Sequence, residues 1–157
     1  MKALVAYSGQ SLPLWPIGDA DIWIAADSAI AQLGEVADWW CPRSGGSVID
    51  SMWEIDRSVK IFASRDDVRE IVRRDRMKML NHAGMMRHED VYVQPRYCDW
   101  QAMPAAAALV LAYHLGAREI DMVGYDGGEN EDEQAMGRVL EWMSRRLVAI
   151  NMKHVEQ

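Results

Sequence analysis

The stretch PAAAALVLAYHLGAREIDMVGYD, residues 104–126, contains a helix pattern followed at once by a strand pattern. Pro104 suits the first turn of a helix, where its missing N–H costs nothing, and Gly116 is a usual residue directly after a helix end. The mostly apolar run Ile120–Val123 then has the length of a buried strand. A helix that leads directly into a buried strand is typical of an α/β domain with a parallel sheet.

The same alternation of short apolar runs and amphipathic segments continues along the chain. Strands are predicted at Ala3–Tyr7, Ile22–Ala26, Ala37–Trp40, Lys60–Ala63, Val91–Gln94 and Ile120–Val123, with a further one near Met152–Val155. The clearest helices are predicted at Asp66–Leu80, Pro104–Leu115 and Glu131–Ile150. In the last helix, apolar residues recur at three- and four-residue spacing as far as Leu147 and Ile150. These patterns predict an α/β fold with a mainly parallel sheet.

Length and charge narrow the classes of protein. With 157 residues, 50% of them hydrophobic, we expect a single domain over residues 1–157. A net charge of −7 repels nucleic-acid phosphate and argues against nucleic acid as a partner. The apolar run at the N-terminus is too short to span a bilayer, so no membrane segment is expected.

The cysteines and histidines show no metal or disulfide pattern, and the tryptophan and methionine content bears on self-association. Cys41 and Cys98 show no C-x-x-C spacing, and the four histidines show no zinc-site spacing, which argues against structural zinc or a disulfide framework. We therefore expect reduced thiols in a cytoplasm. Seven tryptophans and eleven methionines fill cores and self-association surfaces alike, and suggest a homo-oligomer.

Ligands of parallel sheets bind outside the carboxyl ends of the strands. That rule selects candidate ligand-binding residues after the first, second and penultimate predicted strands, and it also selects the segment 41–47 after the third. The candidates are Ser8, Gly9, Gln10, Ser11, Asp27, Ser28, Gly124 and Tyr125. The hydroxyls of Ser8 and Ser11 and the open backbone at Gly9 could meet a phosphate, or the segment could be a plain turn. Neither a dinucleotide fingerprint nor a P-loop is present.

Two acidic residues at strand ends are candidates for direct roles. Asp27 lies where an acid of a dinucleotide fold accepts hydrogen bonds from ribose, or else it is the N-cap of the helix that follows. Asp126 follows a strand between glycines, and we take it as the candidate catalytic residue and the candidate ligand of Mg²⁺. The acids at 131–133 fit a capped first turn of a helix instead, and the spacing from Asp126 does not fit a calcium loop.

Two segments resemble a known superfamily. Residues 7–12, YSGQSL, and 20–29, ADIWIAADSA, resemble a Gly-x-Gly-Pro-Ser-Leu turn and an Ile-Ala-x-Asn strand end, respectively. Residues 106–126 are similar to an Ala-rich helix, a Leu-Gly-Ala turn and a Gly-x-Asp strand end. These features belong to a Rossmann-like superfamily that contains 6-hydroxymethylpterin diphosphokinase-like proteins, CMP-sialic-acid-dependent sialyltransferases and small phage-encoded proteins, and the phage members look most similar.

The resemblance implies a Rossmann-like three-layer sandwich with a nucleotide or nucleotide-sugar site. Ser8, Gly9, Gln10, Ser11 and Asp27 would line that site, with Asp126 near the base or the phosphates. The implied activity is transfer of a phosphoryl or glycosyl group. Asp27 replaces the usual Asn, which adds a negative charge beside a polyanionic ligand. The alternative function is a non-catalytic, phage-type binding module or a homo-oligomeric interaction protein.

Overall fold

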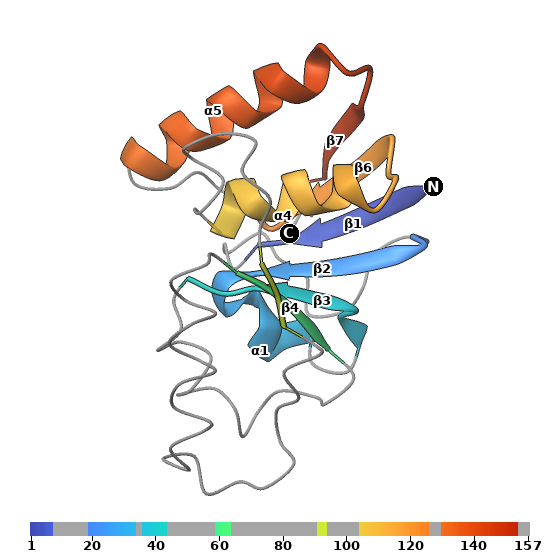
Figure 1. Ribbon diagram of the computed structural model, residues 1–157, viewed down its shortest axis with the longest axis vertical. Coiled ribbons are helices and arrows are strands. Elements are labelled where there is room, and N and C mark those ends of the chain that lie inside the picture. The colour runs from blue at the N-terminus through green and yellow to red at the C-terminus, as the bar shows by residue number, and fades with distance from the viewer. Residues whose placement is uncertain are drawn as a thin grey trace, which may run out of the picture.

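Seven parallel strands form one sheet in the residues described by a computed structural model, which are 1–7, 19–33, 36–43, 59–63, 91–93, 104–125 and 130–153 (Figure 1). The strands are β1 (Lys2–Ala6), β2 (Ile22–Ala26), β3 (Trp39–Cys41), β4 (Lys60–Ala63), β5 (Val91–Val93), β6 (Glu119–Val123) and β7 (Ala149–Lys153). Their order across the sheet is β5-β4-β3-β2-β1-β6-β7, and each neighbouring pair is parallel. The predicted mainly parallel α/β fold is confirmed.

Helices cover both faces of this sheet. On one face, α4 (Pro104–His114) and α5 (Asn130–Ser144) pack over alternate residues of the central strands such as Ala3, Val5 and Ile120. On the other face, the 3-10 turn η1 (Asp27–Ala29) and the short α1 (Ile30–Leu33) pack near Leu4 and Ala6 (Figure 1). Parallel strands that are buried on both faces have nearly continuous apolar sequences, and this is why the central strands could be predicted. This three-layer arrangement is the Rossmann-like sandwich that was expected.

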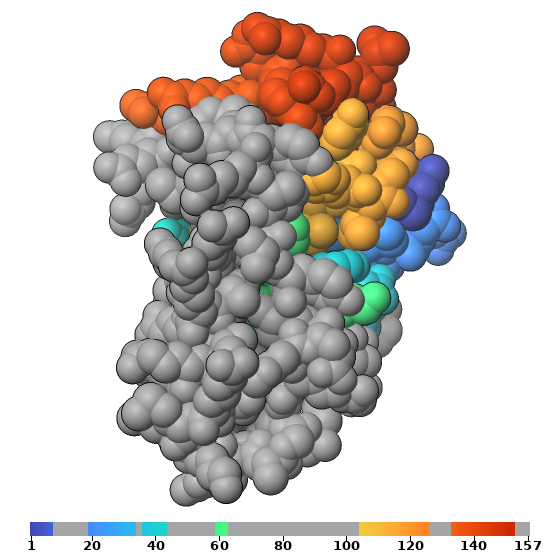
Figure 2. Space-filling view, in the orientation of Figure 1, coloured from blue at the N-terminus to red at the C-terminus, as the bar shows by residue number. Residues whose placement is uncertain are grey.

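Helix α4 is buried on most of its circumference. Ala106, Ala107 and Ala108 are fully buried between the sheet and α5, because their small side chains let the helix backbone approach both neighbours. The two helices lie side by side on the molecular surface (Figure 2), where the rings of Tyr113 and Trp142 meet edge to face at 5.0 Å. Gly116 takes φ 99°, a left-handed conformation that ends helices and favours glycine, as predicted.

The end of α5 differs from the sequence-based prediction. The helix was predicted to reach Ile150, but it ends at Ser144, and β7 begins at Ala149 rather than at Met152. Leu147 adopts φ 57° in the turn and is 89% exposed, so it does not continue the buried stripe. Met136, Val139 and Met143 do form that stripe, since all three are buried against the core.

The other predicted elements agree with the structure to within about two residues wherever they are described. The ranges of β2 and β4 match their predictions, and β1, β3 and β6 are shifted at their ends. The helix predicted over 66–80 lies outside the described residues. Among the described helices, none is both long enough and apolar enough to cross a membrane.

Candidate functional site

The carboxyl ends of four adjacent strands meet at one level edge of the sheet. Ala26 of β2 pairs in register with Cys41 of β3, while Ala6 of β1 pairs with Val123 of β6. From β1 the strands are added outward as far as β5 on one side, and β6 then pairs on the other side of β1. The edge between β1 and β6 is therefore a topological switch point, where open α/β sheets usually bind their ligands.

Gly124 and Tyr125 form the β6 side of this edge. Gly124 has φ 80°, which a side chain would strain, and it turns the backbone immediately after the strand. Tyr125 is half-buried, and its ring packs edge-on against the ring of Tyr7 with 5.2 Å between centroids. Both predicted candidates thus lie beside the end of β1.

Tyr7 and Cys41 form a buried layer under the edge. The Tyr7 hydroxyl donates to the carbonyl oxygen of Ala105 at 2.9 Å and so joins the end of β1 to the first turn of α4. Burial, together with the nearby Cys41 and Tyr125 groups, raises the pKa of Tyr7 well above its usual value. Burial likewise raises the pKa of the Cys41 thiol. Both groups are neutral near pH 7, and Cys41 is a small buried hydrophobe rather than a nucleophile.

Asp27 occupies a special backbone position on the β2 side. It begins the turn η1 with φ 52°, a left-handed conformation that Asp tolerates better than most side chains. The N-cap of this turn is Ala26, and no side chain caps it, so the N-cap explanation for Asp27 is wrong. The buried Trp40 donates its Nε1–H to the Asp27 carbonyl oxygen at 2.7 Å and fixes the turn against β3.

The carboxylate of Asp27 pairs with Arg43, a residue that the sequence reasoning did not single out. Arg43 Nε donates to Asp27 Oδ2 at 2.9 Å, with 53% of the arginine side chain and 33% of the aspartate side chain exposed. Arg43 belongs to the segment after β3 that the strand-end rule had marked, but that rule gave the residue no partner. Ser28 is exposed directly beside this pair.

The remaining candidates lie outside the described residues. They are Ser8, Gly9, Gln10, Ser11 and Asp126. Their roles, including Mg²⁺ binding by Asp126, stay predictions. Within the described part of the chain, no group of three or more His, Cys, Asp or Glu residues could hold a metal ion.

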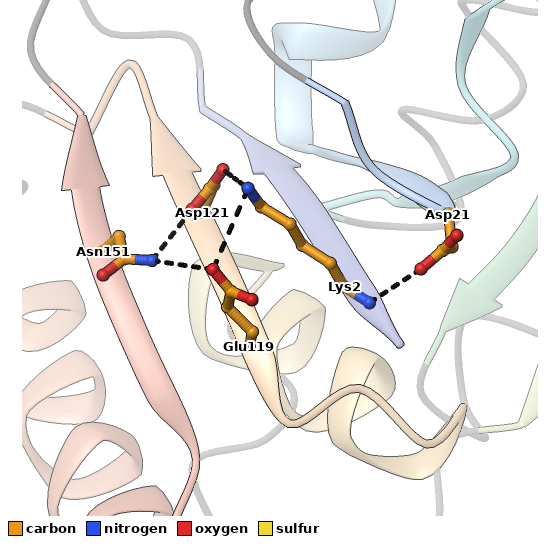
Figure 3. A network of polar contacts seen from close by, with 5 residues as sticks. All are labelled: Lys2, Asp21, Glu119, Asp121 and Asn151. Carbon is orange, nitrogen blue, oxygen red and sulfur yellow. Dashed lines mark hydrogen bonds and ion pairs between the residues drawn. The ribbon is translucent and has the colours of Figure 1, made fainter.

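A second charged cluster lies away from this edge (Figure 3). Asp121, in the middle of β6, is 1% exposed, and its Oδ2 lies 2.9 Å from Lys2 Nζ. Asn151 Nδ2 donates to Asp121 Oδ1 at 3.1 Å, and the Lys2 backbone N–H donates to Asp21 Oδ2 at 2.9 Å. The hydrogen bond to Asp121 raises the pKa of Lys2. This cluster joins β1, β6 and β7 and is a structural feature of the sheet.

Comparison with known proteins supports the fold. No protein-family model and no curated protein sequence matches this chain. A probable thiamine pyrophosphokinase from Staphylococcus saprophyticus is similar in structure, with a TM-score of 0.54, 17% identity and 98% of this chain covered. Thiamine pyrophosphokinase from Bacillus subtilis is similar with a TM-score of 0.52, 14% identity and the same coverage. This chain spans 65% and 61% of the lengths of those proteins, respectively. At such identities the likeness shows a shared α/β fold.

Proposed function

We propose that this protein binds a nucleotide or nucleotide-sugar at the carboxyl edge between β1 and β6 and transfers its phosphoryl or glycosyl part. The observation that carries this proposal is the switch point itself, where the ends of β1, β2, β3 and β6 are level. Ligands of open α/β sheets bind at this position because loops and backbone groups converge there. The names of the similar structures favour phosphoryl-type over glycosyl transfer within the proposal.

The proposed binding mode uses residues from each side of the edge. The half-buried Tyr125 carries an aromatic ring, a group on which bases can stack, while Ser28 and the Asp27–Arg43 pair offer polar contacts. Ser8, Gly9, Gln10 and Ser11 would surround the phosphates. In this proposal Asp126 holds Mg²⁺, which would neutralise charge that develops on the transferred phosphoryl group.

Thermal unfolding against a panel of nucleotides and nucleotide-sugars, with and without Mg²⁺, tests the proposal. A ligand at a hundred times its Kd adds about 2.7 kcal/mol to the free energy of unfolding. For a chain of this size that gain raises the unfolding midpoint by roughly 5–10 °C. We expect one ligand class to give such a rise, and we expect Asp126→Asn to remove its Mg²⁺-dependent part.

The matched control is Glu141→Gln, because Glu141 is an exposed acid near the end of α5 that leads into the start of β7, and so lies away from the carboxyl ends of the strands. This variant should keep the full ligand-induced rise. A panel without any shift would overturn the proposal. A shift without turnover of the same ligand would support the alternative of a non-catalytic binding module, and self-association would then be measured by analytical ultracentrifugation.

A further inference from the structure

Asp27 poses an electrostatic problem for the proposed ligand. A carboxylate beside a phosphate group weakens binding by charge repulsion, and Asp27 follows β2 directly at the ligand-binding edge. The structure places a cation against this carboxylate, since Arg43 Nε lies 2.9 Å from Asp27 Oδ2. Ala26 and Cys41 pair in register on the neighbouring strands β2 and β3, so Asp27 lies one residue and Arg43 two residues beyond the paired positions, at the same end of the sheet. Arg43 therefore offsets the negative charge of Asp27.

The pair is arranged with its cation toward solvent. Arg43 exposes 53% of its side chain, whereas Asp27 exposes 33%. A guanidinium carries five N–H donors in a planar fork that fits the oxygens of phosphate. Because about half of the Arg43 side chain is open to solvent, an approaching anion can reach it while Nε stays bonded to Asp27.

Asp27 is itself held in place. Its carbonyl oxygen accepts the Nε1–H of Trp40, which is 2% exposed, and its backbone is set in the left-handed turn that starts η1. A carboxylate carried on a backbone fixed in this way can orient the long and flexible side chain of Arg43 before a ligand arrives. Orientation in advance reduces the entropy that the arginine loses on binding.

We propose that Arg43 is a phosphate-binding residue of this edge and that Asp27 is its positioning residue. The proposal rests on the proposed nucleotide site and deepens it, because it assigns a role to a residue from the β3 side. It also replaces ribose binding as the role of Asp27. The ligand chemistry that fits is a phosphate or diphosphate group with at least two oxygens free to meet the guanidinium fork.

Titration of the whole chain with inorganic pyrophosphate tests this proposal without knowledge of the base or sugar. Binding is measured by calorimetry, and the Nε–Hε signals of the arginines are followed by ¹⁵N NMR, with the Arg43 signal assigned from its loss in Arg43→Lys. We expect pyrophosphate to shift that signal. We also expect Arg43→Gln to weaken binding at least about tenfold and Arg43→Lys to weaken it less, because a point charge remains without the fork.

The sign of the Asp27→Asn effect separates the two possible roles of Asp27. If Asp27 only repels the ligand, removal of its charge tightens pyrophosphate binding. If Asp27 positions Arg43, Asp27→Asn weakens binding about three- to tenfold and moves the Arg43 Nε–Hε signal toward that of a mobile side chain. We expect weaker binding, and tighter binding would overturn the positioning role.

The matched control pair is Arg145 and Glu141, whose exposed side chains form an ion pair on α5. Arg145→Gln and Glu141→Gln should leave the affinity for pyrophosphate unchanged.

If nucleotides bind and Arg43→Gln does not lower the affinity for them, this inference fails and the proposed function stands. If pyrophosphate binding depends on Arg43 and no nucleotide binds, the proposed function fails and this inference stands. If neither probe binds, both are overturned.

Discussion

The two charged clusters of the sheet have the same contact distance and very different exposure. Lys2 Nζ and Arg43 Nε each lie 2.9 Å from a carboxylate oxygen, of Asp121 and Asp27 respectively. Asp121 is 1% exposed and Asp27 is 33% exposed. A buried carboxylate requires its cation, whereas an exposed ion pair contributes only about 0–1 kcal/mol. The first pair is thus explained by folding, and the second needs an explanation from function.

The largest loss of stability is expected when the buried Asp121 carboxylate loses its cation, Lys2. Lys2→Met leaves the carboxylate of Asp121 buried without its positive partner, so this variant should lose more stability than Asp121→Asn. Asp121→Asn keeps the shape but loses charge-assisted contacts, which should cost about 1–3 kcal/mol. Urea unfolding at neutral pH measures both, and Lys60→Met, which removes an exposed lysine near the Trp39 ring, is the control.

Acid should partly rescue Lys2→Met. Without Lys2 the folded-state pKa of Asp121 rises above its unfolded value, because burial disfavours the charged carboxylate. Stability from such a group is present below the unfolded pKa and is lost as pH rises through the folded pKa. The gap between Lys2→Met and wild type should therefore narrow toward about pH 4. A gap that stays constant would show that the Asp121 carboxylate reaches water, and the contrast between the two clusters would fail.

A smaller effect on the free energy of unfolding is expected from Cys41, which lies beneath the carboxyl edge and is as deeply buried as Asp121. Burial raises its folded-state pKa, so the stability held by the neutral thiol is complete below the unfolded pKa and declines above it. The loss should be about 1 kcal/mol between pH 9 and 10, from the unfolded-state titration. Urea unfolding between about pH 9 and 10 should show that the free energy of unfolding falls less steeply with pH for Cys41→Ala than for wild type.

Tyr7→Phe is the companion variant for this alkaline series. Tyr7 is also buried with a raised pKa, but its unfolded value lies near 10, so its contribution is lost at higher pH than that of Cys41. The free energy of unfolding of Tyr7→Phe should change with pH as that of wild type does up to about pH 10, and it should fall less steeply than wild type above that pH. Equal slopes for wild type and Cys41→Ala would contradict the view that the layer under the edge is sealed.

Sequence patterns predicted the sheet well because parallel strands such as β2 and β4 are short apolar runs between polar segments. They failed at the end of α5, where Leu147 and Ile150 continue the helical spacing. Leu147 instead turns into solvent, and Ile150 packs against the core from β7. Spacing alone does not distinguish the last turn of a helix from the first residues of the strand that follows it.

The candidate site was predictable as an edge but not as a set of contacts. The strand-end rule located Asp27, Gly124 and Tyr125, which the structure places at the ends of β2 and β6, the two strands that flank β1. It could not pair Asp27 with Arg43, since the two are sixteen positions apart and meet only through the register of β2 and β3. The left-handed backbone of Asp27 could not be predicted from the sequence either, because Asp is also a common N-cap residue with an ordinary backbone.

The smallest effect is expected for the exposed pair. Asp27→Asn should change the free energy of unfolding by less than about 1 kcal/mol, because the pair is open to solvent and Asn also tolerates a left-handed backbone. Asp27→Ala should cost roughly 1 kcal/mol more, since Ala is strained at φ 52°. Urea unfolding at low and high salt measures both variants. A loss above about 2 kcal/mol for Asp27→Asn would make the pair a structural element like Lys2–Asp121. A near-neutral result leaves ligand binding as the reason for an acid and an arginine to meet at this edge.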